Sequence, residues 1–291
     1  MKYAFYDNIV KITEADSFNI QEILECGQCF RFNKTGENKY RIIALNKVLD
    51  IEQNGETIFL SPCTEEEFKE LWFNYFDLGT DYAEIKKIIS KDDPIMQKAV
   101  EYAGGIRLLN QEPFETLISF IISQNNNIPR IKGIISRLSK AYGNAYNDED
   151  SFFPDLAALI PVCNDDYMAI GTGFRAKYLC DCVEKLKNNE IDLHSLYNMP
   201  AEAAKKELLK IKGVGPKVAD CVLLFSLGKR DMYPVDVWVK RVTELLYFDG
   251  KDIPKEEISR FAAEKWGKYA GFAQQYLFYY ARSEKIGVDR V

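Results

Sequence analysis

The fold of this chain is decided by residues 208–241, LLKIKGVGPKVADCVLLFSLGKRDMYPVDVWVKR. An amphipathic helix runs into the turn Gly213-Val214-Gly215-Pro216, and a second helix is predicted to begin at or near Lys217. A short loop then leads through Pro234 to Asp236, at the start of a third helix. The stretch therefore predicts one amine and one carboxylate at the starts of two helices.

The turn between the first two helices suits a phosphate group. Gly213, Val214 and Gly215 are expected to expose backbone N–H groups at a helix N-terminus, where the donors and the helix dipole both favour an anion. Lysines in the preceding helix and turn add a basic surface that the overall charge hides: Lys205, Lys206, Lys210 and Lys212.

Composition places the chain among globular proteins with a large core. It has 291 residues, 47% of them hydrophobic, and is expected to divide into roughly two or three subdomains. No apolar run reaches the roughly 18 residues of a membrane span, and the N-terminus lacks a signal-peptide pattern. We expect a cytoplasmic monomer, nucleoid-associated if prokaryotic. The net charge of −6 leaves room only for a local basic face.

Cysteine and histidine usage limits the chemistry. The seven cysteines are predicted to be reduced thiols, and Cys26-Gly27-Gln28-Cys29 lacks the second pair or the histidine that would complete a zinc site. The single histidine, His194, is expected in a surface turn. Catalysis is therefore expected to use Lys, Asp, Glu, Tyr or Cys, with no catalytic metal.

Two domains are expected. Residues 1–98 show alternating segments at 40–44, 47–51 and 57–60, with a hairpin turn at Asn54-Gly55, and helices near 65–76 and 82–90. Residues 99–291 are predicted to be helical, in two subdomains with the active-site cleft between them. Its apolar stripes lie at 114–122, 131–142, 176–186 and 200–211. This organisation is of the α+β class.

Two polar loops interrupt the helices. Residues 123–127, SQNNN, are either a capping turn or a contact loop, and Arg130 is the first of several cations that follow without an acid. Residues 171–177, GTGFRAK, present Phe174 and Arg175 at a helix start. Such a loop could insert a ring into a base stack while the arginine contacts a base or phosphate.

The amine and the carboxylate suit displacement of a base from deoxyribose. Placement of Lys217 at a helix N-terminus near Lys212, under a bound base, favours the free amine that a nucleophile requires. Asp236 would stabilise positive charge that develops on the sugar. The alternative interpretation is a solvated first-turn lysine and a simple N-cap aspartate.

This stretch resembles the helix-hairpin-helix DNA glycosylase superfamily, in which Lys217 matches the catalytic lysine of bifunctional members and Asp236 the catalytic aspartate. Further blocks look like eukaryotic-type 8-oxoguanine DNA glycosylases, in the same order and over nearly the whole chain. They are QCFRF at 28–32, GGIRLLNQEPFE at 104–115, SQNNNIPRI at 123–131, GTGFRAKY at 171–178, GVGPKVADC at 213–221 and WGKYAGFAQQYLF at 266–278.

The resemblance implies an N-terminal antiparallel-sheet (TBP-like) domain before an all-helical helix-hairpin-helix domain. It also implies a DNA glycosylase and abasic-site lyase that flips 8-oxoguanine out of duplex DNA. No cofactor is implied, while a structural monovalent or divalent ion at the hairpin stays open.

The resemblance assigns further roles residue by residue. The carbonyl of Gly27 would accept a hydrogen bond from N7 of the oxidised base, Gln274 would read its Watson–Crick edge, and Cys221 and Phe278 would cover its faces. Asn125 would fill the vacated position, and Arg130 and Arg175 would hold the opposite cytosine. Two departures stand out: Phe174 replaces a tyrosine that is common in the family, and Trp238 replaces a histidine.

Two other functions stay open. A four-cysteine iron-sulfur site is excluded because no cysteine follows Cys221. An alkylpurine glycosylase of the 3-methyladenine type would share the layout but usually lacks the lysine. A non-catalytic damage-binding protein would use the hairpin only to hold a phosphate.

Overall fold

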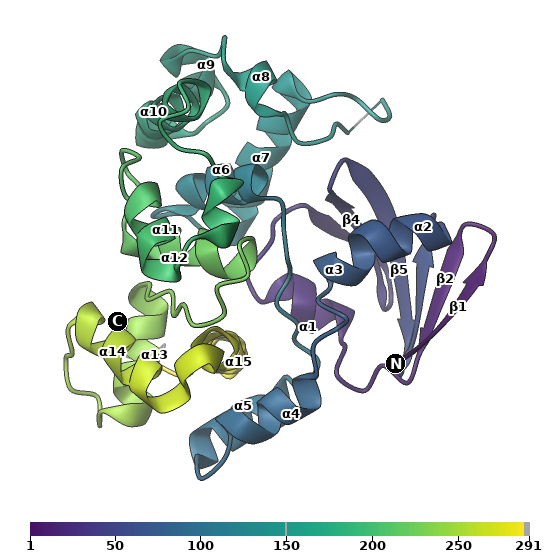
Figure 1. Cartoon of the computed structure of the whole chain (residues 1–291), viewed down its shortest axis with the longest axis vertical. Helices are drawn as coiled ribbons and strands as arrows, with labels where there is room; N and C mark the ends of the chain where they lie inside the picture. The colour runs from purple at the N-terminus through teal and green to yellow at the C-terminus, as the bar shows by residue number, and fades with distance from the viewer. Residues whose placement is uncertain (149, 288–291) are drawn as a thin grey trace.

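The computed structural model describes residues 1–148 and 150–287, which form two lobes (Figure 1). One lobe contains a six-stranded antiparallel sheet in the order β1-β2-β6-β5-β4-β3. The strands are β1 (Lys2–Tyr6), β2 (Ile9–Thr13), β3 (Phe32–Gly36), β4 (Lys39–Ala44), β5 (Lys47–Asn54) and β6 (Thr57–Ser61). The other lobe is helical, which confirms the α+β class with the sheet preceding the helices.

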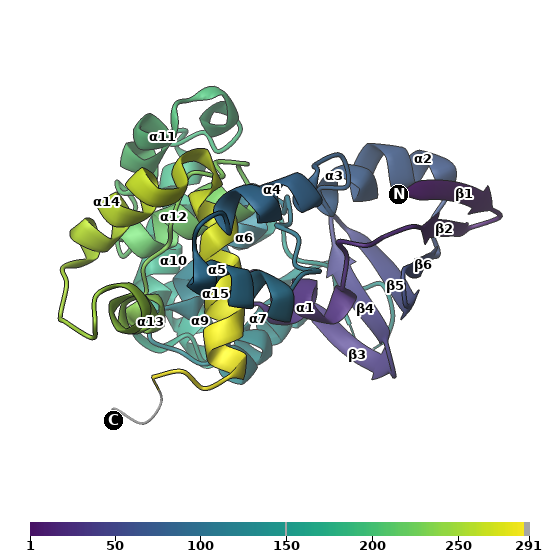
Figure 2. The ribbon, with the colours of Figure 1, turned by 90° about the horizontal axis from the view of Figure 1, so that it is seen from below.

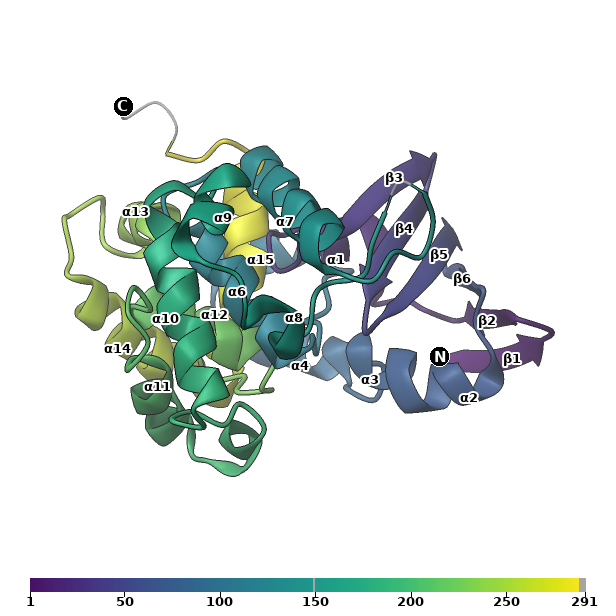
Figure 3. The same cartoon turned by 90° about the horizontal axis from the view of Figure 1, so that it is seen from above.

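The sheet buries one face beneath helices of the same lobe. Alternate residues such as Leu49 and Ile51 of β5 are inaccessible to solvent, as the period of a half-buried strand requires. Helix α1 (Ile20–Glu25) and a continuous helical segment over residues 65–75 supply the opposing side chains. That segment consists of α2 (Glu65–Glu67), a π turn η1 (Phe68–Trp72) and α3 (Phe73–Tyr75), and it lies along the sheet in Figure 3.

The prediction found β4, β5 and β6 but missed the other three strands. β1 and β3 are the two edges of the sheet. β3 carries Asn33, Lys34 and Thr35, all exposed, so its sequence contains no apolar alternation. An edge strand pairs on one side only and needs little apolar surface, which leaves a weak signal in the sequence.

The helical lobe contains α4 (Tyr82–Ile89), α5 (Pro94–Tyr102), α6 (Pro113–Ser123), α7 (Ile128–Tyr142), α8 (Leu156–Leu159), α9 (Asn164–Ala169), α10 (Ala176–Lys187), α11 (Ala201–Leu208), α12 (Pro216–Phe225), α13 (Val237–Tyr247), α14 (Lys255–Trp266) and α15 (Ala270–Ser283). Helix α15 passes through the middle of this lobe, beside α5 (Figure 2). No helix among the described residues is long and apolar enough to cross a membrane.

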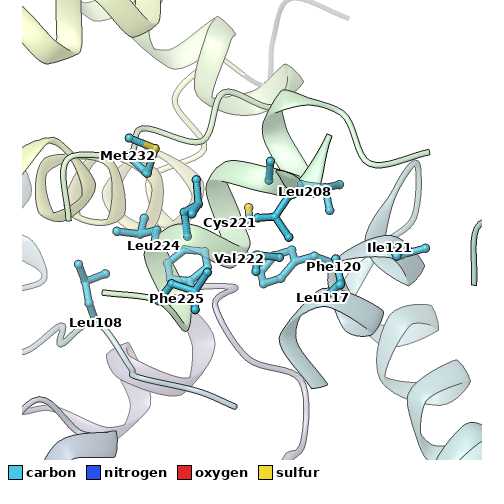
Figure 4. Packing of buried hydrophobic residues seen from close by; sticks show 14 of the residues in the cluster. Leu108, Leu117, Phe120, Ile121, Leu208, Cys221, Val222, Leu224, Phe225 and Met232 are labelled. Carbon is cyan, nitrogen blue, oxygen red and sulfur yellow. The ribbon is translucent and has the colours of Figure 1, made fainter. Parts of the chain in front are cut away.

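Helix α12 lies at the centre of the helical lobe. All its residues from Val218 to Phe225 are buried, and it packs against α6 and α11. The rings of Phe120 on α6 and Phe225 on α12 stack with centroids 5.6 Å apart (Figure 4). Because α12 is enclosed by the core from Val218 onward, packing in the core fixes the position of its N-terminus together with the hairpin.

The first helix of the hairpin is shorter than its sequence pattern predicted. The apolar stripe suggested a helix to residue 211, but α11 ends at Leu208. Ile211 remains buried because the chain turns there, and its carbonyl accepts from the N–H of Val214 at 3.0 Å. The helical spacing of apolar residues therefore extends beyond the end of α11, because Ile211 in the following turn also packs into the core.

The lobes have separate hydrophobic cores, and the chain crosses between them more than once. Tyr82, Ile85 and Met96, on α4 and α5, belong to the core of the helical lobe. Leu109 returns to the core of the sheet lobe. A domain boundary at residue 98 remains a prediction. Residues on both sides of that position contribute to the core of the other lobe.

A buried arginine joins the two lobes. Arg107 is 1% exposed, and its guanidinium donates to the carbonyls of Ser17 and Phe76, each at 3.0 Å, and to those of Asp77 and Thr80 at 2.5 and 3.1 Å. Its own carbonyl accepts from the side chain of Gln28 at 2.8 Å. One cation thus donates hydrogen bonds to carbonyl groups in several loops, outside the hydrogen-bond pattern of the helices and strands.

We predict that Arg107→Met lowers the free energy of unfolding by about 3 kcal/mol or more, because it leaves several buried carbonyls without donors. Equilibrium unfolding in urea measures the change. Arg41→Met is the matched control: Arg41 makes two 2.7 Å bonds to Asp50, but its side chain is 43% exposed. The control should cost less than about 1 kcal/mol; equal losses would contradict the central role of Arg107.

Candidate active site

Lys217 lies in the first turn of α12, after the N-cap residue Gly215 and Pro216. Its side chain is half-buried, and its amine nitrogen lies 4.9 Å from the centroid of the Phe120 ring. Burial raises the pKa of the Cys221 thiol to about 12, and the nearby Lys217 charge opposes that rise. The amine is therefore held beside an aromatic ring and a neutral thiol instead of extending into solvent.

Asp236 lies at the start of α13, as the sequence predicted, and is the N-cap of that helix. Its Oδ1 accepts from the N–H of Val239 at 2.7 Å, and Oδ2 has no hydrogen-bond partner among the described residues. The negative charge of Asp236 adds to the raised pKa of Cys221, so the carboxylate lies near the same thiol as Lys217. The structure brings Lys217, Cys221 and Asp236 together from the starts of two helices.

A second group of predicted residues meets between α1 and α15. Gly27 has φ +82°, a left-handed conformation that favours glycine, and a Cβ at this position would lie 3.3 Å from the Phe278 ring. Gln274 is one turn before Phe278 on α15, hence on the same face, and is 4% exposed. Residues from opposite ends of the chain thus form one wall.

Arg282 belongs to this wall, although the sequence interpretation did not include it. It donates from Nη2 to the carbonyl of Glu25, the last residue of α1, and its guanidinium carbon lies 5.5 Å from the centroid of Phe278. Arg282 therefore ties the Gly27 turn to the ring that faces it. Its spacing of four residues after Phe278 was the available signal.

The two polar loops lie together, held by Arg175 from behind. Arg175 is 2% exposed, and it donates to the carbonyls of Gln124 at 2.7 Å, Asn125 at 2.9 Å and Thr172 at 3.0 Å. Asn125 itself is exposed and has φ +48°. In this structure Arg175 therefore supports the Asn125 turn, and a contact of its guanidinium with DNA stays a prediction.

Phe174 and Arg130 are exposed beside these loops. Phe174 is 48% exposed, which is unusual for a phenylalanine, and its ring packs edge-on against Tyr178 at 5.9 Å. Arg130 lies in the first turn of α7, where Asn127 caps the helix through the Arg130 N–H at 3.0 Å. Both side chains are accessible to a partner, as the predicted roles require.

The hairpin turn packs against the same tyrosine. Gly213 has φ +81°, and a Cβ there would lie 2.3 Å from Cγ of Tyr178. Val214 is 5% exposed and anchors the turn in the core. No protein acceptor is found, within the described residues, for the N–H groups of Gly213 and Gly215. The turn therefore packs closely against Tyr178 and the core, and it leaves the N–H groups of Gly213 and Gly215 available.

The basic surface before the hairpin is smaller than predicted. Lys205 forms a 2.7 Å ion pair with the buried Asp220, and Lys210 forms one with Glu207 at the same distance. Lys206 and Lys212 are exposed. The sequence could not distinguish these pairs, because Asp220 lies on the following helix and meets Lys205 only when the hairpin closes.

Two further predictions agree with the structure, namely the free thiols and the exposed turn at the histidine. All seven cysteines are free thiols, and Cys26 and Cys29 are buried. His194 is exposed in a turn, where its backbone N–H donates to the Asp192 carboxylate at 2.9 Å. No cluster of three or more histidine, cysteine or acidic side chains suited to a metal is found among the described residues.

We predict that Gly213→Ala destabilises the hairpin by about 1–3 kcal/mol, since the methyl group would overlap Tyr178 and the positive φ disfavours alanine. Thermal unfolding with calorimetric enthalpy measures the loss. Gly215→Ala is the control, because its φ is negative and no atom lies within 4 Å of the added Cβ. Comparable losses in both variants would refute the contact with Tyr178 as the cause.

Comparison with known proteins covers both lobes. Residues 9–117 match the family model of the 8-oxoguanine DNA glycosylase N-terminal domain, and residues 118–268 match that of the HhH-GPD superfamily of base excision DNA repair proteins. The N-glycosylase/DNA lyase OGG1 of Arabidopsis thaliana is 34% identical over 87% of this chain and 74% of its own length.

Two solved structures with bound DNA superpose closely. The structure of MBOgg1 with a low-affinity DNA ligand has a TM-score of 0.94 at 40% identity and covers 98% of this chain and 100% of its own. The Clostridium acetobutylicum 8-oxoguanine glycosylase/lyase, bound to double-stranded DNA with cytosine opposite 8-oxoguanine, has a TM-score of 0.94 at 41% identity. It covers 98% of this chain and 99% of its own.

Proposed function

Since the chain belongs to the 8-oxoguanine DNA glycosylase family of the HhH-GPD superfamily and is a DNA N-glycosylase with lyase activity, we propose that it excises 8-oxoguanine from double-stranded DNA. The observation that carries this proposal is the position of Lys217 in the first turn of α12 and of Asp236 at the N-cap of α13, with both charges acting on the pKa of the Cys221 thiol. The resulting abasic product would enter base excision repair.

Lys217 is the proposed nucleophile. Its neutral amine attacks C1′ of the flipped nucleotide, the bond between C1′ and N9 breaks, and the electron pair leaves with the base, which takes up a proton. The sugar ring then opens to a Schiff base with Lys217. Loss of a proton from C2′ allows β-elimination of the 3′ phosphate, and hydrolysis frees the lysine. The scheme needs no cofactor.

Asp236 is proposed to stabilise the sugar as the bond to the base breaks. The transition state has oxocarbenium character, so a nearby carboxylate lowers its energy more than that of the neutral substrate. Capping of α13 uses Oδ1 alone, which leaves Oδ2 for this task. The same residue can therefore serve both as N-cap and as electrostatic stabiliser.

Recognition of the lesion is assigned to the wall between α1 and α15. Oxidation at C8 converts N7 of guanine from an acceptor into a donor, so the carbonyl of Gly27 would bond 8-oxoguanine and face a second acceptor in guanine, a difference of about 1–3 kcal/mol. Gln274 would read the Watson–Crick edge, and Phe278 and Cys221 would cover the faces. The close packing of Gly27 on Phe278, where an added Cβ would lie 3.3 Å from the ring, supports this placement.

The exposed loops are proposed to hold the duplex open. Extrusion of a base costs a few kcal/mol, which Asn125 in the vacated position and Phe174 as a wedge would offset. Arg130 would contact the opposite cytosine, while Arg175 would act there only if it left its carbonyl partners. The N–H groups of Gly213 and Gly215 are proposed to bind a phosphate, alone or around a structural ion, whereas the predicted donor Val214 already donates to the carbonyl of Ile211. Trp238 has a buried indole N–H without a partner, which suggests no phosphate contact.

We predict that Lys217→Gln abolishes covalent trapping. Borohydride reduction of a mixture with duplex containing 8-oxoguanine should crosslink the unaltered protein to DNA, because the Schiff base is reduced to a stable amine. An undiminished crosslink in the variant would eliminate Lys217 as the nucleophile.

Duplexes with each of the four bases opposite 8-oxoguanine would also determine the opposite-base preference. Release of 3-methyladenine instead would favour the alkylpurine alternative, and binding without cleavage a damage-binding protein.

We predict that Asp236→Asn slows single-turnover base release by about 100-fold or more, because it removes the charge that stabilises the transition state. Asparagine remains a good N-cap, so the unfolding midpoint should stay unchanged. Rapid-quench assays with enzyme in excess give the rate, and a fluorescence titration gives the affinity for DNA, which should be retained. A near-normal rate would leave Asp236 with its capping role alone.

A further inference from the structure

Two adjacent glutamines on α15 form a buried amide pair. Gln274 and Gln275 are 4% and 3% exposed, and Nε2 of Gln275 donates to Oε1 of Gln274 at 2.8 Å. Neighbouring residues on a helix point in directions about 100° apart and do not normally meet. Both side chains must therefore converge for this bond, which sequence spacing does not predict.

The bond is the only hydrogen bond that the Gln275 side chain makes in the described part of the chain. Its Oε1 is buried without a donor. A buried amide left half-satisfied destabilises a fold, so the position gains little stability from its polar group. The one effect of the Gln275 amide seen here is its hydrogen bond to Oε1 of Gln274.

The orientation of the pair also has a physical preference. If both amides turned over, Gln275 would leave both hydrogens of its buried NH₂ group without acceptors. Buried N–H groups without partners are rarer than under-satisfied carbonyl oxygens. The observed orientation, with Gln275 as donor, is therefore the favoured one.

Orientation matters because a glutamine amide has a donor at one end and an acceptor at the other. A purine with a carbonyl at position 6 presents an acceptor there and a donor at N1. A purine with an amine at position 6 presents the reverse pattern. At a fixed position, turning an amide over therefore exchanges recognition of one class for the other.

We propose that Gln275 is a positioning residue that fixes the amide of Gln274 in the orientation matching 6-oxo purines, and so sets the preference of the pocket for 8-oxoguanine over 8-oxoadenine. This inference rests on the proposed function, in which Gln274 reads the base. Both lesions carry the same N7 donor and C8 carbonyl, so the Gly27 carbonyl cannot separate them. The Gln274–Gln275 pair acts at the other edge of the ring.

The test compares single-turnover release of 8-oxoguanine and 8-oxoadenine, each opposite cytosine, and uses the ratio of the two rates. Gln275→Glu converts the donor into a carboxylate that only accepts, so Nε2 of Gln274 should turn toward it and Oε1 should face the base. At about pH 8.5 the ratio should fall about tenfold or more in this variant. Gln275→Met, which leaves the Gln274 amide free to turn, should lower the ratio about threefold.

Acidity provides a readout that a purely structural role would not change. The introduced carboxyl of Gln275→Glu can donate again once it is protonated, and burial favours protonation. At about pH 5.5 the ratio should therefore return toward that of the unaltered protein. Gln97→Glu, on the surface of α5, makes the same chemical change away from the pair and should leave the ratio unchanged at both pH values.

Outcomes separate the two levels of the argument. If the unaltered protein releases no 8-oxoguanine, the proposed function fails. If it does, and the ratio stays constant in both Gln275 variants, the positioning role is refuted. Borohydride crosslinking to abasic DNA, which needs Lys217 but no base pocket, establishes that each variant is folded. Should Gln275→Glu fail that control, the uncharged Gln275→Met variant decides.

Discussion

The buried guanidinium of Arg107 is the interaction on which the arrangement of the two lobes depends. It binds carbonyls from loops at Ser17 and at residues 76–80, and its guanidinium carbon lies 4.0 Å from the centroid of the Tyr82 ring. Gln28 extends the network by donating to the carbonyl of Arg107 and accepting from the N–H of Leu109. Because Gln28 follows Gly27 directly, the position of the Gly27 carbonyl is set by this network.

A second constraint is the burial of α12 in the helical core. A helix enclosed on nearly all sides cannot shift without opening cavities, which cost several kcal/mol each. The positions of Lys217 and Cys221 relative to the Phe120 ring are consequently fixed. The buried ion pair of Lys205 with Asp220 then fastens α11 to α12 across the hairpin. The proposed nucleophile is thus carried on a helix that is buried from Val218 to Phe225, while the residues proposed to contact DNA lie on exposed loops.

The loops follow one design, in which an exposed tip is held by a buried support. Asn125 and Phe174 are exposed, and the Arg175 side chain behind them is buried and satisfied by carbonyls. Tyr178 supports both Phe174 and the Gly213 turn. Preorganised tips lose less conformational entropy on binding, which favours tight contact with a deformed duplex.

Local chemistry made part of this protein readable from its sequence. The glycines at the hairpin and the aspartate before α13 determine the backbone of residues next to them in the chain. The turn and the starts of the two helices were therefore predicted correctly. The sequence pattern located six helical segments and three strands. The edge strand β3 was missed because it carries little apolar pattern, whereas β1 and β2 were missed although their apolar side chains pack in or against the core of the sheet lobe.

Contacts between distant segments were decided by the tertiary structure alone. The packing of Gly27 on Phe278, the inward turn of Arg175 and the pairing of Lys205 join residues whose separation in the chain carries no signal. Even the adjacent Gln274 and Gln275, which helix geometry directs apart, meet through a hydrogen bond in the buried part of α15. The sequence therefore indicated which groups are candidates for the chemistry, and packing determined the direction in which each side chain points, because hydrogen-bond geometry depends on the whole core.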